Sequence, residues 1–140
     1  MPNSRLKDIR AAIETHVGTA FSGITITNEP TRLGKLAKDK FPHAVILFYE
    51  EEPERLDFKQ ERRRVRGTID IAVQTTPGDA AEATRETVDL QMESLRDAIF
   101  GDETLTDTVD DVSSGAVTIA SGEGDTIVYG RIEVLTEEVF

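Results

Sequence analysis

Apolar residues recur at helical spacing near the amino terminus of the chain. This stripe consists of Leu6, Ile9, Ile13 and Val17. Because these positions fall on one side of a helix with 3.6 residues per turn, residues 4–17 are predicted to form an amphipathic helix. Gly18 follows as its stop signal.

A second and longer helical pattern covers residues 79–100. Asp79, with Glu82 three residues later, predicts an N-capping box, and Gly101 marks the carboxyl end. The expected core stripe contains Thr84, Val88, Met92, Leu95 and Ile99. Another face carries small residues and the isolated Leu90, so it is suited to lie against a neighbouring molecule.

Alternating and continuous apolar segments predict five strands. They cover residues 23–27, 44–49, 60–75, 112–120 and 126–135. In the longest segment, Val65, Gly67 and Ile69 share one face, whereas Arg62, Arg64, Arg66, Thr68 and Asp70 point the other way because side chains alternate along a strand. The last two segments are joined at residues 122–125, where two glycines favour a hairpin turn over a phosphate-binding loop.

This order of elements predicts an α+β fold. We expect a mostly antiparallel sheet of four to five strands, with an N-terminal helix and a second long helix packed on it. One domain over residues 1–140 is expected from the length of the chain. Residues 32–40 fit a short helix.

Two segments contain more carboxylates than a core accepts. Residues 50–59 are predicted to be an exposed loop or a projecting hairpin arm, and residues 102–111 an acidic loop before a strand. The acids in the first segment are Glu50, Glu51, Glu52 and Glu54.

The charge is unevenly distributed along the chain. Residues 1–78 contain 13 basic and 11 acidic residues, a net charge of +2, whereas residues 79–140 contain 3 basic and 16 acidic residues, a net charge of −13. Such polarity favours docking onto other proteins or other copies, and it disfavours non-specific adhesion to a polyanion.

Composition narrows the possible chemistry. The chain has no cysteine, which excludes disulfides and thiolate chemistry and fits a reducing cytosol. No apolar run has the roughly 18 residues that a membrane span needs, and the first ten residues lack a signal-peptide core. We therefore expect synthesis in the cytoplasm.

Catalytic and metal-binding patterns are weak. His16 and His43 lie on different predicted elements without a metal-ligand spacing, and no Gly-x-Ser-x-Gly nucleophile motif is present. The acids of residues 102–111 do not follow a calcium-loop pattern. We expect no enzymatic activity, no cofactor and no metal.

The basic cluster at Arg62, Arg64 and Arg66 has three interpretations. It forms a solvated strand face, makes salt bridges to another subunit, or contacts nucleic acid. No aromatic residues are interleaved for base stacking.

Several segments together resemble a known protein family. They are Phe41-Pro42-His43-Ala44-Val45-Ile46, the polar arm, Gly67-Thr68-Ile69-Asp70-Ile71-Ala72-Val73, Thr76-Pro77-Gly78-Asp79 before a helix ending Leu95-Arg96-Asp97-Ala98-Ile99-Phe100, and Tyr129-Gly130-Arg131-Ile132-Glu133-Val134. The chain resembles the tail terminator proteins of long-tailed bacteriophages and phage-like particles, also called tail completion or head-tail joining proteins. The resemblance covers nearly the whole chain, with diffuse motifs.

This resemblance implies a structural virion protein. Its members form a hexameric ring on the tail tube, end tube polymerisation, and present a surface to the head-tail connector, or neck protein. Double-stranded DNA passes through the ring without specific binding. The implied location is the virion tail or neck, and the host cytoplasm during assembly.

Two groups of residues are candidates for these contacts. The expected intersubunit contacts are Arg62, Arg64, Arg66, Glu86, Asp89, Leu90 and Glu93. The expected axial or lumen contacts are Glu50, Glu51, Glu52, Glu54, Asp107, Asp110 and Asp111.

Two other functions fit the sequence. One is a head completion or neck connector protein on the portal side of the same particle. The other is a non-viral acidic adaptor domain, which would be monomeric or dimeric with a defined binding groove.

Overall fold

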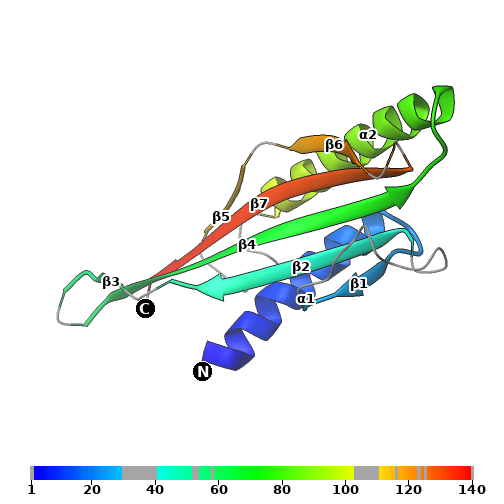
Figure 1. The fold of residues 1–140 in the computed structure, drawn as a ribbon. Coiled ribbons are helices and arrows are strands. Elements are labelled where there is room, and N and C mark those ends of the chain that lie inside the picture. Colours follow the sequence, from blue (N-terminus) through cyan, green and yellow to red (C-terminus); the bar gives the residue numbers. More distant parts are fainter. Residues whose placement is uncertain are drawn as a thin grey trace.

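A computed structural model describes residues 2–29, 41–51, 54–57, 59–102, 111–115, 117–122, 124 and 126–139. Two helices and seven strands lie within these ranges (Figure 1). In chain order they are α1 Pro2–Ala20, β1 Thr25–Thr27, β2 His43–Glu50, β3 Glu54–Arg55, β4 Glu61–Gln74, α2 Asp79–Gly101, β5 Asp111–Ser114, β6 Thr118–Gly122 and β7 Ile127–Val139. The short helix expected at residues 32–40 and most of the acidic loop lie outside the described residues.

All seven strands join one sheet. The main path is β1-β2-β4-β7-β5, with β3 paired to β4 and β6 paired to β7. Only the β1–β2 pair is parallel among these pairings. Both helices cover the same face of the sheet, and no helix or strand of the described residues packs on the opposite face, called the open face below (Figure 1). The prediction of an α+β fold with a mostly antiparallel sheet is confirmed, whereas the strand count of four to five was too low.

The count differs partly because the predicted strand at residues 112–120 is two strands. β5 and β6 pair with successive parts of β7. The register changes by one residue between the pair Ser114 and Val134 and the pair Thr118 and Arg131. Such an extra residue interrupts a strand as a bulge does, so one apolar run forms two short strands at the sheet edge.

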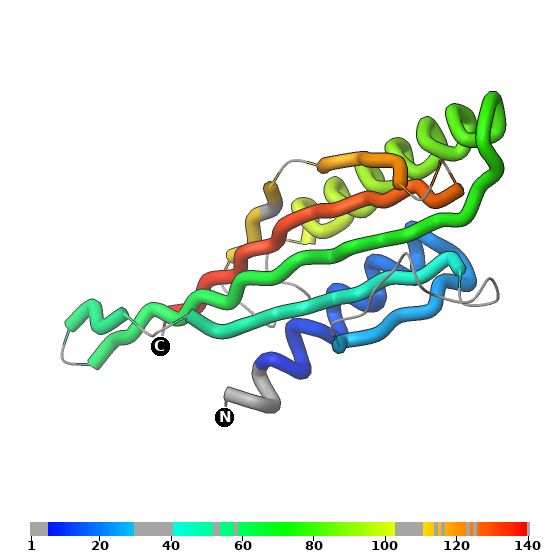
Figure 2. Tube along the Cα trace, in the orientation of Figure 1, coloured from blue at the N-terminus to red at the C-terminus, as the bar shows by residue number. Residues whose placement is uncertain are grey.

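The other additional strand is β3, in the arm. Glu54 pairs with Arg62 and Arg55 with Glu61. The trace projects from one end of the sheet at this point (Figure 2). In the turn, an Asp57 carboxylate oxygen accepts hydrogen bonds from the backbone N–H groups of Lys59 and Gln60 at 2.8 and 2.9 Å. β3 and the start of β4 therefore form a hairpin, which is one of the two predicted alternatives for the arm.

The core lies between the two helices and the covered face of the sheet. Ile46, Ile69 and Ile132 are cross-strand neighbours on β2, β4 and β7, and all three are fully buried. The predicted stripes of both helices contribute the opposing layer, with Ile9, Ile13, Val17, Val88, Met92, Leu95 and Ile99 buried. The predicted alternation along β4 is confirmed.

The predicted capping box of the second helix is wrong. Gly78 occupies the N-cap position with φ 94°, and no side chain caps the helix. The Gly78 carbonyl instead accepts hydrogen bonds from the N–H groups of Ala81 and Glu82. Glycine adopts this positive φ without a steric cost, so the chain turns into the helix one residue earlier than expected. Asp79 and Glu82 lie in the first turn, where the helix dipole favours negative charge.

Candidate functional site

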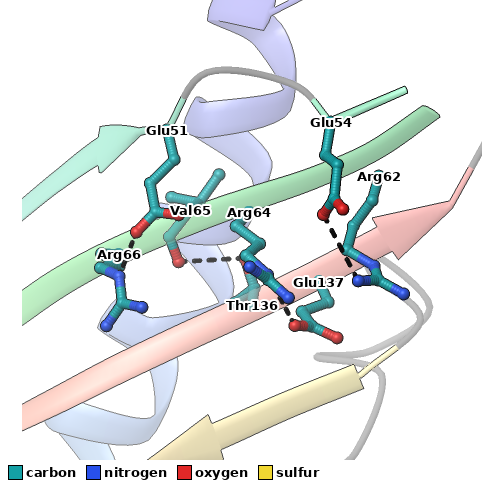
Figure 3. A network of polar contacts seen from close by, with 8 residues as sticks. All are labelled: Glu51, Glu54, Arg62, Arg64, Val65, Arg66, Thr136 and Glu137. Carbon is teal, nitrogen blue, oxygen red and sulfur yellow. Dashed lines mark hydrogen bonds and ion pairs between the residues drawn. The ribbon is translucent and has the colours of Figure 1, made fainter. Parts of the chain in front are cut away.

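A row of ion pairs connects the arm to the open face of the sheet. Arg62, Arg64 and Arg66 lie on this face because they occupy alternate positions of β4 (Figure 3). Arg62 Nη1 lies 3.4 Å from Glu54 Oε2, and Arg64 Nε lies 2.9 Å from Glu137 Oε1. The third arginine pairs with Glu51.

The Arg66 guanidinium is the most strongly affected cation of this row. Its hydrogen bond to Glu51, together with the negative charge of that carboxylate, raises the Arg66 pKa above its ordinary value. The same arrangement holds for Arg131, whose pKa is raised by a hydrogen bond to Asp70 and by the charge of Asp70.

A fourth pair lies on the covered face at the arm end of the sheet. Arg63 Nε lies 2.5 Å from Glu50 Oε1, and the two side chains are 17% and 24% exposed. Arg63 points to this side because it follows Arg62 by one residue in an alternating strand. Polar side chains thus replace the apolar core where the sheet becomes the arm.

These ion pairs connect acids that the sequence predicted at the ring axis or lumen with arginines of β4, two of which it predicted at intersubunit contacts. Glu50, Glu51 and Glu54 were expected at an axis or lumen, and in the chain they neutralise arginines of β4. Asp111 is exposed at the start of β5. The remaining members of that group, Glu52, Asp107 and Asp110, lie outside the described residues. Contacts with another subunit stay a prediction, because the structure contains one chain.

The outer surface of α2 is the second candidate surface. Glu86, Asp89 and Glu93 are exposed there, and Leu90 among them is 71% exposed. The helices cover the face opposite to the arginine row (Figure 1). A pairing of these acids with Arg62, Arg64 or Arg66 therefore requires two copies of the chain.

A groove of about 360 Å³ runs between α1 and α2 beside Leu90. It is lined by His16, Thr19, Ala20, Leu90, Gln91, Ser94 and Ala98. At one side His16 Nε2 lies 2.8 Å from a carboxylate oxygen of Asp102, the residue after α2, so this pair ties α1 to the end of α2.

The described residues contain no cluster of three or more metal-ligating side chains. The two histidines are separate: His16 pairs with Asp102, whereas His43 is buried in β2 with its Nε2 3.1 Å from the Thr27 hydroxyl. Their positions supply structural hydrogen bonds to neighbouring elements.

The Arg131–Asp70 pair offers a test of how the open face is organised. The two residues are directly opposite on β7 and β4, and Arg131 donates two hydrogen bonds at 2.5 and 3.1 Å. We expect Arg131→Ala to lower the free energy of unfolding by about 1 kcal/mol, because the 20%-exposed Asp70 carboxylate loses its partner.

Urea denaturation of Arg131→Ala, Asp70→Ala and the double variant measures the coupling between the two side chains. A coupling of about 0.5 to 1 kcal/mol is expected for a cross-strand ion pair. The control is Lys59→Ala on the exposed arm. Additive effects of the two substitutions contradict the prediction.

The sequence predicted that Arg62, Arg64 and Arg66 share one face of a strand, but it did not predict which carboxylates pair with them. Arg64 and Glu137 are 73 positions apart, and they meet only because β4 and β7 pair with Arg64 directly opposite Glu137. The predicted last strand ended at residue 135, before this glutamate. Thr136, Glu137 and Glu138 are three consecutive polar residues after Val134 and Leu135, so no apolar–polar alternation in the sequence indicated that the strand continues.

Comparison with models of known protein families gave no match for the chain, and a search of curated proteins found no significant similarity. Among the described residues, neither helix is long and apolar enough to cross a membrane.

Proposed function

We propose that this chain is a structural virion protein of the tail terminator type. Copies form a ring, expected to be a hexamer, on the last ring of tail-tube protein. The ring ends tube polymerisation and presents its other side to the head-tail connector. The protein acts by assembly and not by catalysis, and its place is the tail or neck of the particle.

The observation that carries this proposal is the two-sided construction of the domain. An arginine-bearing sheet face and an acidic helix surface lie on opposite sides of the sheet. A ring of identical subunits needs two different surfaces on each subunit, since every contact is made head to tail. The sheet face mixes arginines with paired carboxylates, whereas α2 exposes mainly acids, and two such different charge patterns favour one relative orientation of the copies.

The arm provides a second support. The ion pairs at Glu51 and Glu54 hold it against β4, and its tip turn is internally hydrogen bonded. Exposed pairs of this kind contribute little to stability, about 1 kcal/mol or less each. A hairpin that projects from the end of the sheet is suited to make contacts outside its own domain, with a neighbouring subunit or the tube.

The ring proposal is compatible with passage of DNA. The excess of acids in residues 79–140 repels phosphate at long range, and the arginines of the sheet face are already paired with carboxylates. DNA therefore passes the ring without being held by it.

The experiment is a capping assay with the cognate tail-tube subunit. We expect purified protein, added in substoichiometric amounts during polymerisation, to arrest tube growth and to appear as a ring at one tube end in negative-stain electron micrographs. A matched control adds the variant Leu90→Glu, which changes an exposed position of the proposed ring surface. Protein that leaves tube length unchanged but seals DNA-filled heads assigns the chain to the neck, and protein that does neither contradicts both roles.

A further inference from the structure

A hollow of about 320 Å³ lies on the open face of the sheet. It extends across three strands, from Tyr49 of β2 over Thr68 of β4 to Glu133 of β7. The hollow forms because the Thr68 side chain is short, whereas the side chains on either side of it are long. Tyr49 is 59% exposed, so its ring is an aromatic wall that another molecule can reach. The hollow therefore offers room for one long side chain between an aromatic ring and a carboxylate.

The carboxylate of this hollow is not neutralised within the chain. Glu133 is exposed and makes no ion pair with any described residue. Two arginines flank it: Arg131 is two residues earlier on β7, and Arg66 lies diagonally across on β4. The pKa of each arginine is raised mainly by its own partner, Glu51 or Asp70, and to a smaller extent by the charge of Glu133. Glu133 is thus an unpaired anion between two cations that already have partners.

The helix layer carries the reverse arrangement. Arg85 of α2 is exposed, and it has no ion-pair partner in the part of the chain that the structure describes. Glu82 and Asp89 lie one turn before and one turn after it, so two exposed acids flank this cation on the same side of the helix. Arg85 cannot reach Glu133 of its own chain, because α2 covers the other face of the sheet (Figure 1).

The two arrangements have similar lengths. Arg66 lies opposite Leu135, so the two arginines that flank Glu133 are separated by four positions of β7, or about 13 Å. The two acids that flank Arg85 are separated by seven positions of α2, or about 10 Å. The flanking arginines are 49% and 59% exposed, so each keeps guanidinium donors for a second carboxylate. A helix laid along β7 therefore brings each charge of one arrangement next to an opposite charge of the other.

We propose that Arg85 of a second copy enters the hollow, stacks on the Tyr49 ring and forms an ion pair with Glu133. Arginine fits this site because its planar guanidinium can stack on an aromatic ring and pair with a carboxylate at the same time. The sheet supplies the acid and the helix the base, which reverses the polarity expected from the arginine row. The two surfaces are different, so the contact is head to tail and continues from copy to copy. This inference rests on the self-assembly proposed above and names the pair that carries it.

Carbodiimide cross-linking tests the contact directly. Full-length Arg85→Lys keeps the positive charge and supplies an amine, which forms an amide bond with a touching carboxylate while the carbodiimide takes up the water that is lost. Isotopically labelled and unlabelled copies are mixed, and mass spectrometry identifies peptides that join two chains. We expect about tenfold more product between position 85 and Glu133 than between Lys7, an exposed lysine of α1, and Glu133.

The matched control for the cross-link is the double variant Arg85→Lys with Glu133→Gln, in which the product has to disappear. Absence of the product between position 85 and Glu133 in Arg85→Lys overturns the proposal. A yield equal to that of Lys7 also overturns it, because random collisions of exposed groups then explain the cross-link.

A charge exchange gives an independent measurement. Arg85→Glu and Glu133→Arg are each expected to weaken self-association about tenfold, and the double variant to recover most of the loss, because the reversed charges attract again. Lys7→Glu and Asp111→Arg make the same changes of net charge at other exposed positions and should have little effect. Sedimentation gives the association constants, and thermal unfolding verifies that each variant is folded. Equal weakening by the controls, or a double variant no better than the single ones, contradicts the pairing.

The outcomes separate this contact from the proposed function. Tube capping by a protein without the cross-link between position 85 and Glu133 leaves the terminator role in place and refutes the contact. A strong cross-link in a protein that does not cap tubes supports the contact and counts against the terminator role.

Discussion

Gly67→Val is expected to lower the free energy of unfolding by about 3 kcal/mol, because the site has no room for a side chain. Gly67 lies on the covered face of β4, directly opposite Phe48 of β2. A Cβ atom at Gly67 would lie 2.5 Å from Phe48 Cε1 and 2.6 Å from the Leu47 carbonyl oxygen. The Phe48 ring can turn, but the carbonyl belongs to a paired strand, so the strain has to be absorbed by the sheet.

Thermal and urea denaturation measure this effect. For a chain of this length, a loss of that size lowers the melting temperature by about 10 °C. Gly18→Ala is the matched control, because Gly18 is exposed in α1 with nothing within 4 Å of an added Cβ. Alanine is favoured over glycine inside a helix by about 0.5 to 1 kcal/mol, so this variant should gain stability.

Gly130→Ala sharpens the comparison. An added Cβ at Gly130 would meet Met92 Cγ and Sδ of α2 at 3.0 Å, which is a tight contact with a flexible side chain. Methionine adapts to such changes, so we expect a smaller loss than for Gly67→Ala. A Gly67→Ala variant as stable as Gly130→Ala would show that β2 and β4 are less closely packed than the structure indicates.

The spacing of apolar residues correctly predicted those helices and strands whose buried and exposed faces follow from the period of the element itself. Along β4, the alternation that separates Arg64 from Val65 depends only on the period of a strand, and the stripe of α2 that ends at Ile99 depends only on the period of a helix. The split of residues 112–120 into β5 and β6 was not visible, because it comes from the register against β7. The start of α2 was misplaced because Gly78 replaced a side-chain cap with a backbone conformation.

The candidate site shows the same difference between features that follow from local sequence and features that depend on pairing between distant segments. The arginine row and the acids of residues 50–54 were both evident in the sequence, but their mutual pairing depends on how the arm folds along β4. The sequence placed Leu90 on a face of the second helix separate from the core stripe, and Leu90 is 71% exposed in the structure. The groove beside Leu90 could not be predicted from the sequence, because it depends on how α1 packs against α2.

The in-chain pairs change what charge can contribute to assembly. Arg62, Arg64 and Arg66 are between 33% and 49% exposed, so each guanidinium retains donors for a second carboxylate. A neighbouring Glu86 or Glu93 would share an arginine instead of meeting a free one. Such shared contacts fix orientation more than they add affinity.

The second large effect is expected at the centre of the core. Ile69→Ala should lower the free energy of unfolding by about 4 kcal/mol, because the lost methyl and methylene groups leave a cavity between Ile46 and Ile132 that the paired strands cannot close. Thr68→Ala is the matched control on the same strand. Its side chain points to the open face and is only half-buried, so the loss should stay within about 1 kcal/mol.

Urea denaturation measures the free energy of unfolding of both variants, with the same dependence on urea concentration used for each. The comparison also separates folding from assembly. Ile69→Val, which removes one methylene for about 1 kcal/mol, should reduce stability without changing the arrest of tube growth, because Ile69 is fully buried. Equal losses for Ile69→Ala and Thr68→Ala would mean that the two faces of β4 are equally covered. The open sheet face, on which the two-sided assembly depends, would then already be occupied within the chain.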